Sequence, residues 1–383
     1  MKARVVAVGL VAIAGLAVVA PSEPRPADAS PVIGASARLS SGASAGTSAE
    51  RISPPRPPTG NPAGPPLPAH ALPVDTSHPD RVIGDGTPAS CTSQAVVSAV
   101  AAGGVITFDC GPHPVRIVMA ETAKVVNRSP VVVLDGGGRV TLDGAGQRRI
   151  LYMNTCDPAQ VWTTPHCQNQ DHPRLTIQGL DFTGGDSTGE TAEGGGGGAV
   201  FVRGGRVKVV DSTFTGNRCD TTGPDVGGAA LRVLSQYDGQ PVIVARSTFG
   251  GSAPDGNACS NGAALSSIGV SWEVYNSVFT HNDAIGNGAN PARPGSPGGG
   301  SGGAIYLDGN RFTFDLVGSI VTDNTANEGG GAIFFVSNNR TGELRISDST
   351  LARNPSGRFE TPGYPGIFFL GLGSPQVTDS SIS

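Results

Sequence analysis

The chain has 383 residues and a formal net charge of −5, and only 15% of its residues are charged and 5% aromatic. Its 57 glycines and 31 prolines make up nearly a quarter of the sequence, which excludes a helical bundle, because each glycine inside a helix costs roughly 1 kcal/mol relative to alanine. The charge balance also excludes a broadly basic surface of the kind that binds nucleic acid.

The first 29 residues have the features of a signal peptide. Lys2 and Arg4 precede an apolar run over residues 5–20, and Ala27-Asp28-Ala29 supplies small residues for cleavage after Ala29. The apolar run is short for a membrane-spanning helix, and no later apolar stretch is long enough to be one. We therefore expect a protein without a membrane span that is secreted or lies at the cell surface.

Residues 30–80 are rich in Pro, Ser, Ala and Gly and contain no Phe, Trp or Tyr. Such a segment cannot bury enough apolar surface to offset the entropy lost on ordering. The composition predicts a disordered linker that acts as a semi-extended spacer.

The rest of the chain, residues 81–383, is organised by two interleaved repeats. An eleven-residue frame begins at Leu175, Val207, Val242, Trp272, Phe314 and Leu344, and a shortened copy begins at Pro375. A second frame, typified by Gly-Gly-Ala and an apolar run, lies between these copies. Positions one and three of the first frame are apolar and position two is mostly polar, the alternation of a half-buried strand. Since each coil can bury its apolar side only against its neighbours, the repeats predict a β-solenoid rather than a propeller.

Equivalent positions of stacked coils should form ladders. Position eight is apolar in every copy, which predicts a buried column; its residues are Phe182, Phe214, Phe249, Phe279, Val321, Leu351 and Ile382. Position eleven is Asn217, Asn282, Asn324 and Asn354, which predicts a ladder of turn asparagines. Residues 92–102 predict a short helix that caps the N-terminal end, with Ser90 or Thr92 as its N-cap.

The frames also resemble a known group of proteins. Gly-Gly-Ala-Ile together with Phe-x-x-Asn, as in Phe214–Asn217 and Phe279–Asn282, resembles the repeats of chlamydial polymorphic outer-membrane proteins. The region over residues 81–383 as a whole resembles bacterial secreted proteins of the pectin-lyase-like superfamily. This resemblance implies an all-β fold, a right-handed parallel β-helix, with the cap and first coils at 81–150 and the repeated coils at 175–383.

The six cysteines of an exported chain predict three disulfides. Cys91 and Cys110 flank the capping helix, Cys156 and Cys167 close one loop, and Cys219 and Cys259 follow the turns of adjacent coils. The alternative for the second pair is a metal site that includes His166 and His172. No motif for a bound cofactor is found, although the acidic loop with Asp181, Asp186, Glu190 and Glu193 offers oxygen ligands to Ca²⁺. A solvated loop is the alternative interpretation.

The catalytic residues of pectate lyases and polygalacturonases have no match in this sequence. The best catalytic candidates are Glu273, Asp315 and Arg345, which occupy position two of successive coils and should form an outward ladder. Neighbouring carboxylates suit a glycosidase pair or a Ca²⁺ site, and the alternative is a surface ion pair between Asp315 and Arg345.

Two functions remain open. The first is a non-enzymatic surface or secreted protein for adhesion or for binding an extracellular polysaccharide or cell-surface glycan. The alternative is a polysaccharide lyase or glycoside hydrolase on the same scaffold. The missing catalytic motifs favour the first.

Overall fold

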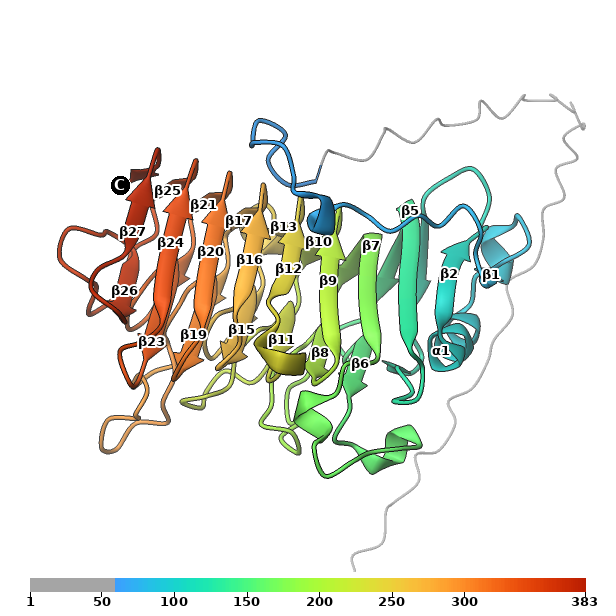
Figure 1. Cartoon of the computed structure of the whole chain (residues 1–383), viewed down its shortest axis with the longest axis horizontal. Helices are drawn as coiled ribbons and strands as arrows, with labels where there is room; N and C mark the ends of the chain where they lie inside the picture. The colour runs from blue at the N-terminus through green and yellow to red at the C-terminus, as the bar shows by residue number, and fades with distance from the viewer. Residues whose placement is uncertain (1–58) are drawn as a thin grey trace, which may run out of the picture. The chain divides into compact units, whose positions relative to one another are not determined.

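The computed structural model describes residues 59–383, and from residue 81 onward they form a parallel β-helix (Figure 1). Every pair of named strands is parallel, so the predicted all-β solenoid is confirmed. The predicted signal peptide and residues 30–58 of the predicted linker lie outside the described residues. Within residues 59–383, no helix has the length and apolarity needed to cross a bilayer.

Three sheets run along the solenoid. Sheet A has 17 strands, which are β1 Arg81–Ile83, β2 Gly104–Phe108, β3 Val115–Val118, β5 Val131–Asp143, β7 Arg174–Thr183, β9 Arg206–Val210, β10 Thr213–Thr215, β12 Val242–Ala245, β13 Thr248–Gly250, β16 Trp272–Tyr275, β17 Val278–Thr280, β20 Thr313–Val317, β21 Ile320–Thr322, β24 Glu343–Ser347, β25 Thr350–Ala352, β27 Gln376–Thr378 and β28 Ser381–Ile382. Sheet B has eight strands, which are β4 Ala123–Lys124, β6 Leu151–Asn154, β8 Val200–Arg203, β11 Leu231–Val233, β15 Leu265–Ile268, β19 Ile305–Gly309, β23 Ile333–Ser337 and β26 Ile367–Leu370. Sheet C consists of β14 Ala258–Cys259, β18 Asp283–Ala284 and β22 Thr325–Ala326.

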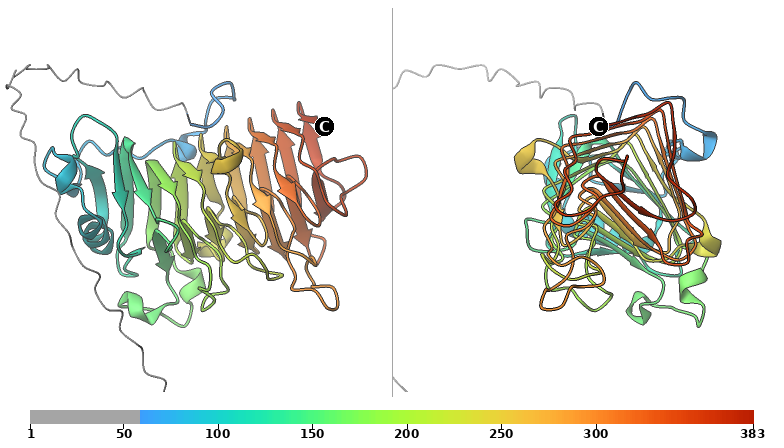
Figure 2. Two further views of the ribbon diagram at one scale, coloured as in Figure 1. Left: turned by 180° about the vertical axis from the view of Figure 1, so that it is seen from behind. Right: turned by 90° about the vertical axis from the view of Figure 1, so that its left-hand side faces the viewer.

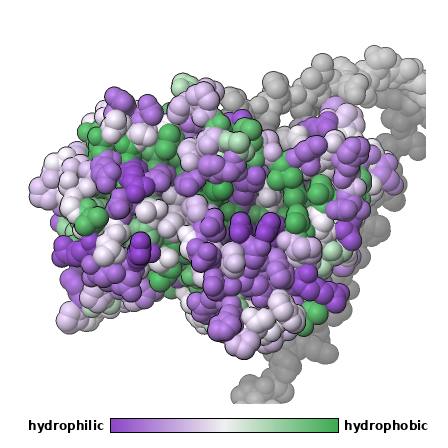
Figure 3. Space-filling view, viewed as in Figure 1, coloured by the Kyte–Doolittle hydropathy of each residue, from purple (hydrophilic) through white to green (hydrophobic). Residues whose placement is uncertain are grey.

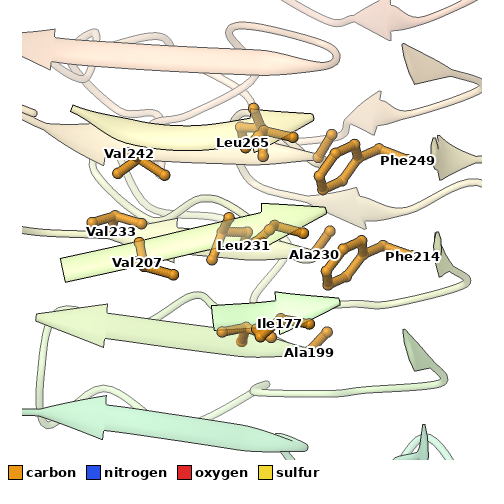
Figure 4. Close-up of a cluster of buried hydrophobic side chains, with 14 of the residues drawn as sticks. Ile177, Ala199, Val207, Phe214, Ala230, Leu231, Val233, Val242, Phe249 and Leu265 are labelled. Carbon is orange, nitrogen blue, oxygen red and sulfur yellow. The ribbon is translucent and has the colours of Figure 1, made fainter. Parts of the chain in front are cut away.

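The repeat frames are the structural coils, in the register that the sequence predicts. Val242 pairs with Trp272, and Trp272 pairs with Phe314, so position one of each frame meets position one of the next. The apolar side chains of sheets A and B meet inside the coils (Figure 4). In that core the predicted position-eight column is buried from Phe182 to Leu351, and its four phenylalanine rings stack with centroids 4.8–5.0 Å apart.

The asparagine ladder is also confirmed, with one member that the frame does not contain. The side-chain amide of each asparagine donates to the Oδ1 of the asparagine in the next coil at 2.8–2.9 Å. The order is Asn217, Asn257, Asn282, Asn324 and Asn354. Asn257 was missed because an insertion with a short 3₁₀ helix at Ala253–Asp255 moves it out of position eleven. All five side chains are buried, so the ladder satisfies polar groups inside the turn.

The predicted capping helix is α1, Ser93–Ala102, and it lies at the N-terminal end of the solenoid (Figure 1). The Thr92 hydroxyl accepts a hydrogen bond from the N–H of Ala95, as an N-cap does, and Gly103 ends the helix. The helix buries Val96 against the first coils.

All three disulfides pair as predicted. They join Cys91 to Cys110, Cys156 to Cys167 and Cys219 to Cys259. Disulfides persist in oxidising compartments, so these bonds fit an extracellular environment.

The linker prediction is wrong for residues 59–80, which we call the strap. The strap lies in an extended path on the outside of sheet A (Figure 2). The backbone N–H of Asn61 donates to the carbonyl oxygen of Asn276 at 2.7 Å, and the backbone of Val74 exchanges two hydrogen bonds with the side-chain amide of Gln178 at 2.9 and 3.0 Å. The strap therefore bridges several coils.

Two physical causes explain why this proline-rich segment is ordered. Prolines at 62, 65, 66, 68, 73 and 79 already restrict the backbone, so docking costs less conformational entropy than in an ordinary chain. The strap also buries Ala71 completely against Val210 and Ala245 of sheet A. Composition alone describes a spacer, but the coils provide hydrogen-bond partners and an apolar contact for it.

Candidate functional site

The predicted outward ladder exists on sheet A. Ile243 pairs with Lys208 on one side and with Glu273 on the other, Glu273 pairs with Asp315, and Asp315 pairs with Arg345. The structure therefore brings the three catalytic candidates together in adjacent strands.

Each of these candidates already contacts another polar or charged side chain. Arg345 Nη1 lies 3.2 Å from Asp315 Oδ1, and His70 Nε2 of the strap lies 2.7 Å from Glu273 Oε2. The Tyr275 hydroxyl donates to the same Glu273 oxygen at 3.0 Å. Burial raises the pKa of Asp315, and the positive charge of Arg345 opposes that rise. These contacts are those of a structural ion pair and a strap anchor.

A groove of about 490 Å³ lies beside this ladder, between the strap and the loop that precedes β12. We call it groove A, and it is lined by His70, Arg174, Leu175, Thr176, Arg206, Val207, Lys208, Gln240, Pro241, Ile243 and Glu273. Its volume is within the range of small-ligand sites, roughly 300–1,000 Å³. The face of the molecule that carries sheet A mixes hydrophilic and hydrophobic side chains (Figure 3).

Positive charge prevails in groove A. Arg174 and Arg206 both contact the carboxylate of Asp171, with Arg206 Nη2 2.7 Å from Asp171 Oδ1. These contacts, that of Arg174 foremost, hold the pKa of Asp171 below its usual range. Two guanidinium groups thus share one carboxylate, and both arginine side chains remain substantially exposed, at 53% and 38%.

Lys208 adds a third cation to groove A. Its Nζ donates to the carbonyl oxygen of Leu72 at 2.8 Å, and no carboxylate of the described residues forms an ion pair with it. Burial lowers the pKa of Lys208. Its charge is therefore held beside the strap by a neutral oxygen and stays available to an anion.

The two predicted metal-binding alternatives lose their ligands to other contacts. Cys156 and Cys167 are joined to each other, which removes both thiolates from the alternative zinc-type site. In the acidic loop, Glu190 pairs with Arg149 at 2.9 Å and Glu193 pairs with Arg203 at 2.7 Å. Over residues 59–383, no cluster of His, Cys, Asp and Glu is arranged to hold a metal ion.

Sequence reasoning missed His70 and a second polar groove on sheet B. His70 lies in the segment predicted to be a spacer, and nothing in its neighbourhood marks it as a contact for a coil. The sheet B groove contains Arg232 and Asp308, which lie on strands of the second frame. The signal that could have been used is Arg232 itself, because it pairs with Phe201 in a column that is otherwise largely aromatic.

Comparisons of the chain with protein-family models, with curated proteins and with solved structures found no match.

Proposed function

We propose that this chain is an exported parallel β-helix protein that binds an acidic extracellular polysaccharide in groove A. The observation that carries the proposal is the cationic lining of this groove, where Lys208 has no carboxylate partner among the described residues and Arg174 and Arg206 share one. An anionic polymer that crosses from β7 to β9 would meet Arg174 first and then Arg206 and Lys208, because these neighbouring strands lie about 4.8 Å apart.

The export signal in the sequence, the disulfides and the resemblance to secreted β-helix proteins support an extracellular location. The contacts of Glu273 and Asp315 support binding over catalysis. Arg345 Nη1 contacts both oxygens of Asp315, at 3.2 and 3.4 Å, and His70 and Tyr275 contact Oε2 of Glu273, so both carboxylates already make structural contacts.

The test is calorimetric titration of the secreted protein with polygalacturonate, alginate and hyaluronate at several salt concentrations. Lys208→Met keeps the apolar stem but removes the charge, and a charge-assisted hydrogen bond contributes about 1.5–3 kcal/mol. We therefore expect affinity to fall by roughly 10- to 100-fold and the remaining binding to depend less on salt.

Lys124→Met is the matched control, because Lys124 is an exposed lysine on sheet B, away from groove A. It should bind the acidic polymers as the unaltered protein does. If none of the three polymers binds, or if Lys208→Met binds them as tightly as the control, the proposal is wrong. Release of new reducing ends from any of them would favour the enzymatic alternative.

A further inference from the structure

A second groove, of about 410 Å³, crosses the outer face of sheet B, and we call it groove B. Its lining combines charged, amide and apolar side chains; the residues used below are Arg203, Asp225, Arg232, Leu234, Ile268 and Asp308. Groove B shares no residue with groove A and belongs to the opposite repeat frame.

Two carboxylates of groove B are held together by one amide. Asn290 Nδ2 lies 2.7 Å from Asp225 Oδ1, 3.0 Å from Asp308 Oδ2 and 2.8 Å from the Tyr306 hydroxyl oxygen. An amide nitrogen carries two hydrogens, so it cannot satisfy all three oxygens. Each ionised carboxylate also has about four acceptor positions, so both Asp225 and Asp308 keep acceptor capacity for another donor.

Arg232 brings unmet donor capacity to the same groove. Its side chain is 2% exposed, and its hydrogen bonds go only to neutral oxygens, with Nη1 3.0 Å from Ser266 Oγ and Nη2 2.5 Å from the carbonyl oxygen of Asp225. Its Nε has no partner, and no carboxylate forms an ion pair with it in the described part of the chain.

This arrangement is costly for the fold. A buried guanidinium without a paired carboxylate loses hydration that neutral oxygens replace only in part. Burial accordingly lowers the pKa of Arg232 to about 10. Arg232 lines groove B and its Nε is buried without a hydrogen-bond partner, so the guanidinium keeps a donor that none of the described residues uses.

The other groove residues define the charge and polarity of that ligand. Arg203 is neutralised by Glu193 at 2.7 Å, while Asp225 and Asp308 form no ion pair with any residue of 59–383 and repel an anion. Leu234 and Ile268 are half-buried and supply an apolar surface between the polar groups. The fitting ligand is uncharged, with groups that both donate and accept hydrogen bonds and with an apolar face.

We infer that groove B binds an uncharged, hydroxyl-rich ligand of the carbohydrate class. Sugar hydroxyls donate to Asp225 and Asp308 and accept from Arg232, and the C–H face of the ring packs against Leu234 and Ile268. This site is additional to the acidic-polysaccharide site proposed in groove A. With both occupied, one molecule joins an acidic glycan to a neutral one.

The experiment titrates the secreted protein with the neutral hexasaccharides of maltose, cellulose, laminarin, mannan and chitin, followed by saturation-transfer NMR and calorimetry. At least one should bind in the micromolar to millimolar range. Asp225→Asn, at an exposed position, and Asp308→Asn should each weaken that binding by tenfold or more. Lys124→Met serves as the control and should bind the same hexasaccharide unchanged, because Lys124 lines neither groove A nor groove B.

Two results overturn the inference: no hexasaccharide binds, or binding persists within twofold in both aspartate variants. Titration with the acidic polymers distinguishes groove B from groove A, because the Asp225→Asn variant should bind these polymers as tightly as the unaltered protein does. If the protein binds neutral hexasaccharides but no acidic polymer, the proposed function is wrong and the inference on groove B stands. If it binds acidic polymers but no neutral hexasaccharide, the inference on groove B is wrong and the proposed function stands.

Discussion

The stacked phenylalanines allow the packing of the solenoid to be measured quantitatively. Phe249 is fully buried, and its ring stacks on Phe214 at 4.8 Å and on Phe279 at 4.9 Å, nearly parallel in both cases. Phe279 has only one such stack, because its neighbour in the next coil is Val321. Both residues are fully buried phenylalanines, and they differ in the number of aromatic rings stacked on them.

Replacing a buried phenylalanine by alanine costs about 3–5 kcal/mol, from lost transfer free energy and the cavity that remains. A stacked aromatic pair contributes about 0.5–1.5 kcal/mol beyond burial. We therefore expect both Phe249→Ala and Phe279→Ala to lower the free energy of unfolding within the first range. The loss in Phe249→Ala should exceed that in Phe279→Ala by about the value of one stack.

Equilibrium unfolding in urea, followed by fluorescence, measures this difference, because Trp272 is fully buried in β16 beside this column. The slopes with denaturant must agree among the variants for the free energies to be compared. Losses below about 1 kcal/mol would show that the column is not packed as described. A larger loss in Phe279→Ala than in Phe249→Ala would refute the role assigned to stacking.

Three further predictions concern other parts of the fold. Glu328 is buried, and the hydrogen bonds from Arg293 hold the pKa of its carboxyl below the ordinary value of 4.5. The stabilisation that the ionised carboxylate gives to the fold is therefore fully present above pH 4.5 and is lost as pH falls through the lower folded pKa. Glu328→Gln should thus cost about 1.5–3 kcal/mol at pH 7, and the difference in melting temperature from the unaltered protein should shrink only as pH falls below 4.5 and through the lower folded pKa; a difference that does not change between neutral and strongly acidic pH would contradict the ion pair. Limited proteolysis should leave a resistant fragment that still contains residues 59–80, and trimming to Asp80 would show that the strap does not dock. Removing the disulfide with a Cys219→Ser, Cys259→Ser double variant should lower the free energy of unfolding by about 2–4 kcal/mol, and an unchanged melting temperature in non-reducing buffer would contradict the pairing.

The coils could be predicted because equivalent residues recur. Val207 and Val209 alternate with Lys208, and the same alternation returns in the frames that begin at Trp272 and Leu344. This recurrence indicates both the buried face and the register of each strand. The ladder of Glu273, Asp315 and Arg345 followed from the same register. The local sequence was also sufficient to predict α1, because an N-cap threonine and a glycine mark the two ends of the helix.

The contacts that set the candidate sites were decided by the tertiary structure. His70 and Glu273 are separated by 203 residues, and the segment around His70 has the composition of a free linker. Asp225 and Asn290 lie in loops between coils, which differ in length and have no shared pattern. Strand positions repeat because each must match its neighbours at a fixed spacing of about 4.8 Å. Loops and the strap are free of that constraint, so their contacts depend on which coil surfaces they meet in space.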